Sequence, residues 1–142
     1  MNQWEKIFKL DVEQHDNRNI IFVAKLNSGI LAITGTHTPH AGASDTQKDS
    51  YYNTLKDIHI KYGGKNNIHY LVGDFNARII NRAPAEEHII GLFYLKDEDC
   101  TSDILSDNQK DNRKRFIEFS NVPFSSSLLR YEKISLKSAI VW

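Results

Sequence analysis

An apolar run that ends in two short polar residues constrains this chain more than any other feature. Residues 68–72 are rich in β-branched and aromatic side chains, which is typical of a buried strand, and Gly73 then lets the backbone turn. Asp74 and Asn76 follow at the carboxyl end of that strand, where open α/β sheets place their ligands. The two residues either serve chemistry, as a proton acceptor and a phosphate-oxygen ligand, or form an ordinary Asx turn.

Residues 45–62 predict a helix before this run. Apolar side chains recur there at three- and four-residue spacing, which gives a helix one buried face. Ser44 and Gln47 are placed to form a capping box at its start, and Gly63-Gly64 predicts its end.

Strand patterns come first in the chain. Residues 8–12 alternate between apolar and polar side chains, which predicts an outer strand with one face in the core. Residues 20–26 and 30–35 predict an antiparallel hairpin, and the turn Asn27-Ser28-Gly29 offers residue types that suit a positive φ.

The pattern after the run is weaker. Residues 79–99 predict a long loop with a short strand or turn, and residues 107–120 predict a second helix whose aromatic residues form a buried face. The sequence does not assign a definite structure to the tail, residues 122–142.

Two of these motifs resemble one known family. The hexapeptide Gly-Asp-Phe-Asn-Ala-Arg at 73–78 resembles the Gly-Asp-Phe-Asn motif of the endonuclease/exonuclease/phosphatase (DNase I-like) family. It is most similar to the endonuclease domains of non-LTR retrotransposons and to related craniofacial-development-protein-like sequences. Residues 33–42 resemble that family's strand ending in Tyr-Ala-Pro, and the intervening helix matches in place. The resemblance covers roughly residues 4 to 121.

This resemblance implies an α/β fold, an incomplete four-layer α/β/β/α sandwich. It implies a partial family domain over residues 1–121, followed by the tail. It also implies Mg²⁺-dependent hydrolysis of phosphodiester bonds in nucleic acid. Asp74 would orient or deprotonate the attacking water, Asn76 would hold a phosphate oxygen, and His37, standing where the family has a tyrosine, would contact the phosphate.

The family's metal-ligand Glu and its C-terminal Asp-His pair match no residue here, so no metal ligand is assigned. Two classes of function therefore stay open. The chain is either a member or fragment of this nuclease family, derived from a retroelement, or a non-catalytic remnant or interaction module without the metal site. In an incomplete sandwich, unpaired strand edges favour self-association.

Composition and charge limit the kinds of partner and compartment that we expect for this chain. At 142 residues, 40% of them hydrophobic, the chain is expected to form one domain. Its 18 basic and 18 acidic residues give a formal net charge of zero, which argues against strong nucleic-acid binding. The cluster Arg113-Lys114-Arg115 is interleaved with acids and predicts a solvated helix face.

No apolar run is long enough for a membrane span, and the single Cys100 suits a reducing compartment, the nucleus or cytoplasm.

The histidines do not predict a zinc site. His37 and His40 flank a Thr-Pro dipeptide, but zinc needs three or four converging ligands. The remaining histidines are predicted to be structural, His59 and His69, or to lie in surface loops, His15 and His88.

Overall fold

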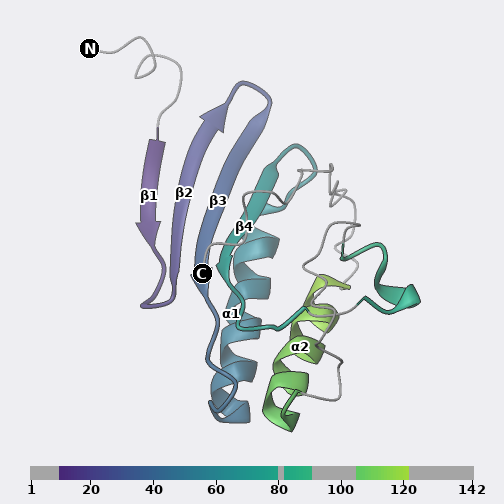
Figure 1. The fold of residues 1–142 in the computed structure, drawn as a ribbon. Coiled ribbons are helices and arrows are strands. Elements are labelled where there is room, and N and C mark those ends of the chain that lie inside the picture. Colours follow the sequence, from purple (N-terminus) through teal and green to yellow (C-terminus); the bar gives the residue numbers. More distant parts are fainter. Residues whose placement is uncertain (1–9, 80–81, 91–104, 122–142) are drawn as a thin grey trace.

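The computed structural model describes residues 10–79, 82–90 and 105–121. Strands β1 (Leu10–Gln14), β2 (Asn19–Leu26), β3 (Gly29–His37) and β4 (Ile68–Asp74) form one sheet in the order β1-β2-β3-β4 (Figure 1). Neighbouring strands are antiparallel except β3 and β4, which are parallel because helix α1 (Asp45–Tyr62) connects them. With helix α2 (Asp107–Ser120), the described part is a mixed α/β fold.

Helix α1 begins and ends as the sequence predicts. The Ser44 hydroxyl accepts a hydrogen bond from the Gln47 backbone N–H, and the Gln47 side chain accepts one from the Ser44 N–H, so the capping box is confirmed. The helix stops at Gly63, whose φ of −86° any residue could adopt. Glycine is needed there because a Cβ would lie 2.6 Å from the His59 carbonyl oxygen.

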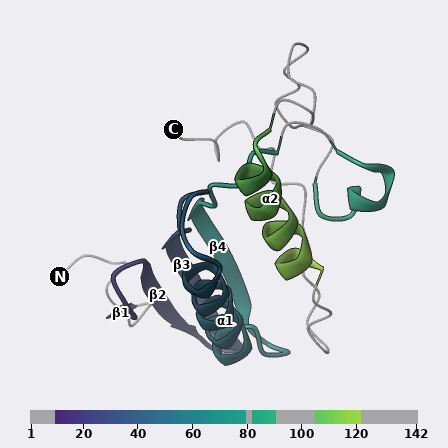
Figure 2. The ribbon, with the colours of Figure 1, turned by 90° about the horizontal axis from the view of Figure 1, so that it is seen from below.

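The core lies between the sheet and the two helices. Ile21, Val23 and Ala32 of the sheet pack against Ile58 and Tyr62 of α1. A second cluster joins α1 to α2 through Tyr51, Tyr52, Leu55 and Phe119, with Leu71 of β4 packed against it. Figure 2 shows α1 lying against one face of the sheet with α2 beside it.

The hairpin between β2 and β3 forms, but by a different turn from the one expected. Leu26 pairs with Gly29, so Asn27 and Ser28 make the connection. The predicted positive φ is wrong, because within the described residues only Gly73 and Asn76 adopt one. Gly29 is required for another reason: a Cβ would lie 1.9 Å from the Asn66 carbonyl oxygen, since the loop before β4 passes directly over it.

Residues 68–72 form a strand, as predicted, but the prediction that this strand is buried is wrong. β4 is an edge strand, and Ile68, Tyr70 and Val72 are 48%, 43% and 48% exposed. The outer position of β1 is confirmed, but its Val12 is 54% exposed and not in the core; Phe8 lies outside the described residues. Both differences arise because, among the described elements, α1 packs on one face of the sheet and none packs on the other.

The segment after β4 contains a short 3-10 helix, η2 (Pro84–Glu86), and a turn that buries Ile89 and Ile90. The rest of the predicted loop, residues 91–99, and the tail lie outside the described residues. The second predicted helix is confirmed as α2, with Phe119 buried.

Candidate functional site

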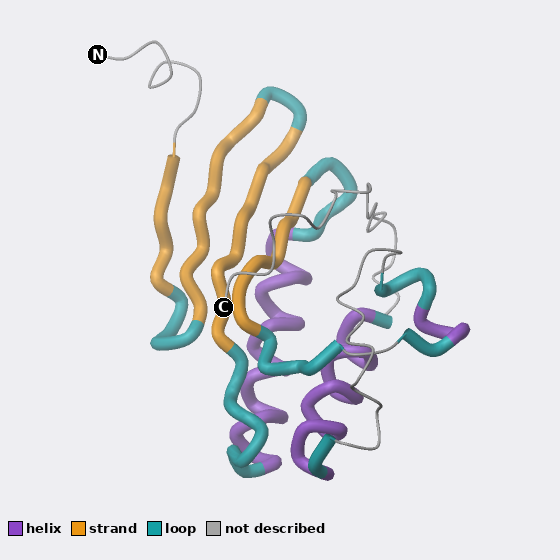
Figure 3. Tube along the Cα trace, in the orientation of Figure 1, coloured by secondary structure: helices purple, strands orange, loops and turns teal. Residues whose placement is uncertain are grey.

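The two predicted strand-end residues lie side by side. β3 and β4 run in parallel, so their carboxyl ends lie at the same end of the sheet, which is called the β3–β4 edge below (Figure 3). Their register places His37 directly opposite Asp74, and His37 Nε2 lies 4.0 Å from Asp74 Oδ2. Both side chains are largely exposed, at 66% and 51%. The two residues therefore meet at the same end of the sheet, on neighbouring strands.

Gly73 fixes the direction in which Asp74 leaves the strand. Its φ is +145°, a conformation that side chains other than hydrogen rarely allow. A Cβ at this position would lie 1.9 Å from the Thr36 carbonyl oxygen of β3. The glycine in the motif is therefore required both by its backbone conformation and by close contact between the strands.

Asn76 donates two hydrogen bonds that hold it in place. Its backbone N–H donates to Asp74 Oδ1 at 2.8 Å, which is the hydrogen bond of an Asx turn, and its φ is +46°. Its side-chain Nδ2 donates to the Thr38 carbonyl oxygen at 2.7 Å. The Asx turn is thus present, and it leaves the other carboxylate oxygen, Oδ2, as the one nearest His37.

A buried asparagine that the sequence patterns do not single out supports both loops. Asn112 of α2 is fully buried, and its Nδ2 donates to the carbonyl oxygens of Pro39 at 3.1 Å and Asn76 at 3.3 Å. The signal for it was its spacing, because Asn112 precedes the buried Phe119 by two helical turns and shares its face. Helix α2 therefore ties the loop after β3 to the loop after β4.

Arg18 brings a positive charge to the same edge. Its guanidinium donates to the His37 carbonyl oxygen at 3.3 Å, and the His37 N–H donates to the Arg18 carbonyl oxygen. The turn that carries Arg18 is organised by Asp16, which accepts hydrogen bonds from the Arg18 and Asn19 N–H groups. Burial raises the pKa of Asp16, but these donors outweigh burial and hold the pKa below its usual value.

Between α1 and β4, His59 and His69 form a pair. Their Nδ1 atoms lie 3.1 Å apart and the rings are stacked, while His69 Nε2 lies 2.9 Å from the Thr34 hydroxyl. Burial, and secondarily the neighbouring His59, lowers the pKa of His69 to about 4. His15 and His88 are exposed in loops, as predicted.

The basic cluster on α2 is not a solvated face, so that expectation is wrong for two of its residues. Arg113 pairs with Glu86, and Arg115 pairs with Asp111 and with Asp49 of α1, so their side chains are only 22% and 19% exposed. Of the partners only Asp111 is interleaved with the cluster in the sequence, whereas Glu86 and Asp49 come from distant segments. Arginine can donate two parallel hydrogen bonds to one carboxylate, as Arg113 does to Glu86.

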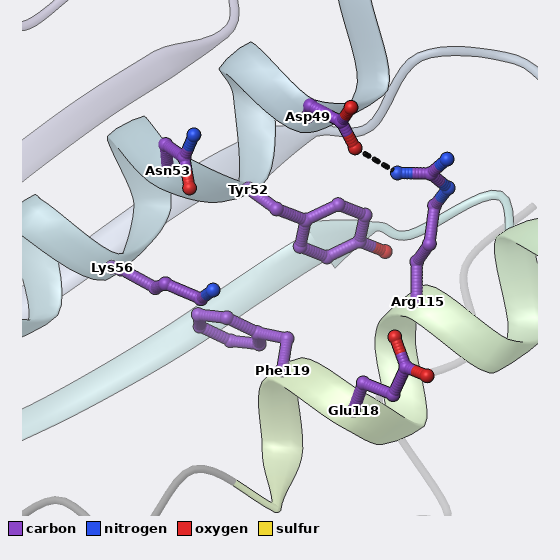
Figure 4. A pocket seen from close by; sticks show the side chains of 7 residues that line it. All are labelled: Asp49, Tyr52, Asn53, Lys56, Arg115, Glu118 and Phe119. Carbon is purple, nitrogen blue, oxygen red and sulfur yellow. Dashed lines mark hydrogen bonds and ion pairs between the residues drawn. The ribbon is translucent and has the colours of Figure 1, made fainter. Parts of the chain in front are cut away.

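A pocket of about 310 Å³ opens between α1 and α2 (Figure 4). Its lining mixes aromatic and charged side chains from both helices, namely Asp49, Tyr52, Asn53, Lys56, Arg115, Glu118 and Phe119. Burial raises the pKa of Tyr52, whose hydroxyl has no hydrogen-bond partner among the described residues. None of the predicted site residues lines this pocket.

Within the described ranges, no three His, Cys, Asp or Glu side chains gather closely enough to hold a metal ion. Neither helix in those ranges has the length and apolar character of a membrane span. Comparison with models of protein families, with curated protein sequences and with solved structures finds no match for this chain.

Proposed function

We propose that this chain belongs by descent to the endonuclease/exonuclease/phosphatase family and that the edge formed by β3 and β4 faces a phosphodiester of nucleic acid. The single observation that carries the proposal is the pairing of His37 with Asp74, in register, at the carboxyl ends of adjacent parallel strands. The incomplete four-layer sandwich and the retroelement origin are part of the same proposal. An intracellular location, in the nucleus or cytoplasm, fits a nucleic-acid substrate.

The side chains at this edge suit hydrolysis of a phosphodiester. The Asp74 carboxylate can accept a proton from an attacking water through Oδ2, because Oδ1 already accepts the Asn76 N–H. The Asn76 amide donates one N–H to Thr38 and has a second donor for a phosphate oxygen. The His37 imidazole is exposed beside Asp74 and can donate to another phosphate oxygen.

Electrostatics and rigidity at the edge also favour an anionic ligand. The guanidinium of Arg18 donates to the His37 carbonyl oxygen and so adds a positive charge to this edge. Asn112 holds the loops that carry Asn76 and follow His37 in a fixed relation. Donors that are positioned before the ligand arrives stabilise developing charge without reorganisation.

The described residues do not fit a Mg²⁺ site by themselves. Asp74 and His37 are a pair, and no third candidate ligand joins them in the described part of the chain. Mg²⁺ prefers several oxygen ligands. We therefore assign no catalytic step to the ion and expect the isolated chain to cleave DNA weakly or not at all.

The alternative function is a non-catalytic interaction module that retains the strands and the motif. It is favoured by a specific observation, the Asx turn, since Asp74 and Asn76 bond to each other as they would in a purely structural loop. The two functions differ in whether the edge recognises a phosphodiester.

A nuclear magnetic resonance titration distinguishes them. We would follow the histidine ring signals while adding a thymidine dinucleotide, and compare the unaltered chain with His37→Ala and with a matched control, His88→Ala, which removes an exposed histidine from another loop. The proposal predicts that the His37 ring signals shift in a saturable manner and that the His88→Ala variant binds normally. Equal weakening by both substitutions, or shifts spread evenly over the exposed histidines, would contradict it.

A further inference from the structure

The face of the sheet opposite α1 is apolar from one edge to the other. One row of paired residues crosses all the strands: Val12 pairs with Phe22, Phe22 with Ile33, and Ile33 with Tyr70. The next row contains Ile20 and Val72, on either side of Gly35. We call these six side chains, Val12, Ile20, Phe22, Ile33, Tyr70 and Val72, the outer face.

Each of these side chains is substantially exposed. Val12 is 54% exposed and Phe22, Ile33 and Tyr70 are 38%, 36% and 43% exposed, whereas Ile21 and Val23, which alternate with them on β2, are 0% and 5% exposed. Strand alternation places apolar side chains on both faces of β2, so the outer face matches the core-facing side in character. Antiparallel sheets with one solvated face usually alternate with polar residues there.

The outer face carries no charged side chain within these two rows of the described sheet. The residues that complete them are neutral, and the nearest ionisable pair in register is His37 with Asp74, at the end of β3 and β4. A flat surface without charge can meet an identical copy without like-charge repulsion. The charge distribution therefore permits an isologous contact, in which the same patch is used by both copies.

The exposed area is sufficient for a weak dimer. From their exposed fractions, these six residues leave about 500 Å² of surface open, which is near the upper limit for a patch on a monomer. Two copies would bury about 1,000 Å² there, and flanking residues such as Ile68, 48% exposed, bring the total near the lower end of the range for specific interfaces.

We propose that the outer face is a dimer interface, in which two copies of this chain pack their sheets face to face. Sheets packed in this way cross at about 30°, as in sandwich folds. Phe22 and Ile33 lie on the two inner strands and would form the centre of the contact. This inference does not depend on the proposed phosphodiester site, and it differs from pairing through strand edges because it uses side chains and not backbone groups.

The test compares two isoleucine substitutions by analytical ultracentrifugation. Ile33→Glu places a charge at the centre of the outer face, and Ile60→Glu is the matched control, because Ile60 is 70% exposed on α1. We expect the unaltered chain and Ile60→Glu to show a concentration-dependent dimer, with Ile33→Glu at least tenfold weaker in association. Mixing Ile33→Glu with Ile33→Lys should restore a dimer of one copy of each.

A folding defect is separated from loss of the interface by circular dichroism and by a second variant, Tyr70→Lys, which changes an edge-strand residue that is 43% exposed. A folded, monomeric Tyr70→Lys supports the proposal. A monomeric unaltered chain would overturn it, including the case in which another segment of the same chain covers the face. Equal association of the unaltered chain, Ile33→Glu and Tyr70→Lys would overturn it as well.

Discussion

The buried histidine pair makes the stability of this protein depend on pH. Neutral rings are favoured because His59 and His69 face each other through their Nδ1 atoms, so that one ring donates a hydrogen bond and the other accepts it. Protonating both rings would set two donors against each other. The groups around His69 are Thr34, His59 and Tyr62, and Tyr62 donates in turn to the Glu13 carboxylate.

The sign and size of the effect follow from the pKa of His69. Its value falls from 6.5 to about 4 on folding, so between these values the unfolded chain binds more protons than the folded one. Stability is therefore fully present above pH 6.5 and decreases as the pH falls toward 4. At pH 5 the loss relative to pH 7 is about 2 kcal/mol from this residue. Burial also lowers the pKa of His59, which acts in the same direction.

Urea unfolding at pH 7 and pH 5 measures this loss. Gln at position 69 keeps a hydrogen-bonding side chain but cannot take up the proton, so His69→Gln should lose about 2 kcal/mol less than the unaltered chain over this interval. His88→Gln, in an exposed loop, is the matched control and should behave like the unaltered chain. Working at pH 5 and above avoids the carboxylates whose pKa values lie low, such as Glu13. An identical pH dependence in the unaltered chain and His69→Gln would show that protonation of His69 does not set this pH dependence.

Three further predictions concern the motif, the helix contacts and activity. Gly73→Ala should destabilise the fold by several kcal/mol because its Cβ would collide with β3, whereas Gly42→Ala, whose Cβ would be 3.4 Å from its nearest neighbour, should have a small effect; thermal unfolding compares them. Glu86→Gln should lower the free energy of unfolding by about 1–2 kcal/mol, because it weakens the hydrogen-bonded ion pair with Arg113, and a urea titration at pH 7 measures this. The isolated chain with Mg²⁺ should nick plasmid DNA weakly or not at all, and robust nicking that Asp74→Ala abolishes would show that the chain holds a complete metal site.

Local patterns predicted the helices and the strand order well. The capping box at Ser44 and the three- and four-residue periodicity define α1 completely, because hydrogen bonding and burial in a helix involve residues near in sequence. A strand-helix-strand unit favours parallel neighbouring strands, and β3 and β4 pair in this way, which brings His37 and Asp74 together.

Contacts between distant segments could not be predicted in the same way. The apolar run at 68–72 has the composition of a buried strand, yet its burial depends on what covers the second face of the sheet. Gly29 is required by the Asn66 carbonyl, and Asn112 satisfies two loop carbonyls, through contacts that span dozens of residues. The local sequence does not indicate which distant residues Gly29 and Asn112 contact.

A crystal structure of the chain with a thymidine dinucleotide would show whether the ends of β3 and β4 receive a phosphodiester. We expect electron density for the phosphate between the His37 ring and the Asn76 amide, with Asp74 Oδ2 facing the phosphorus. A dinucleotide bound instead in the pocket between α1 and α2, with the His37 edge empty at the same ligand concentration, would contradict it.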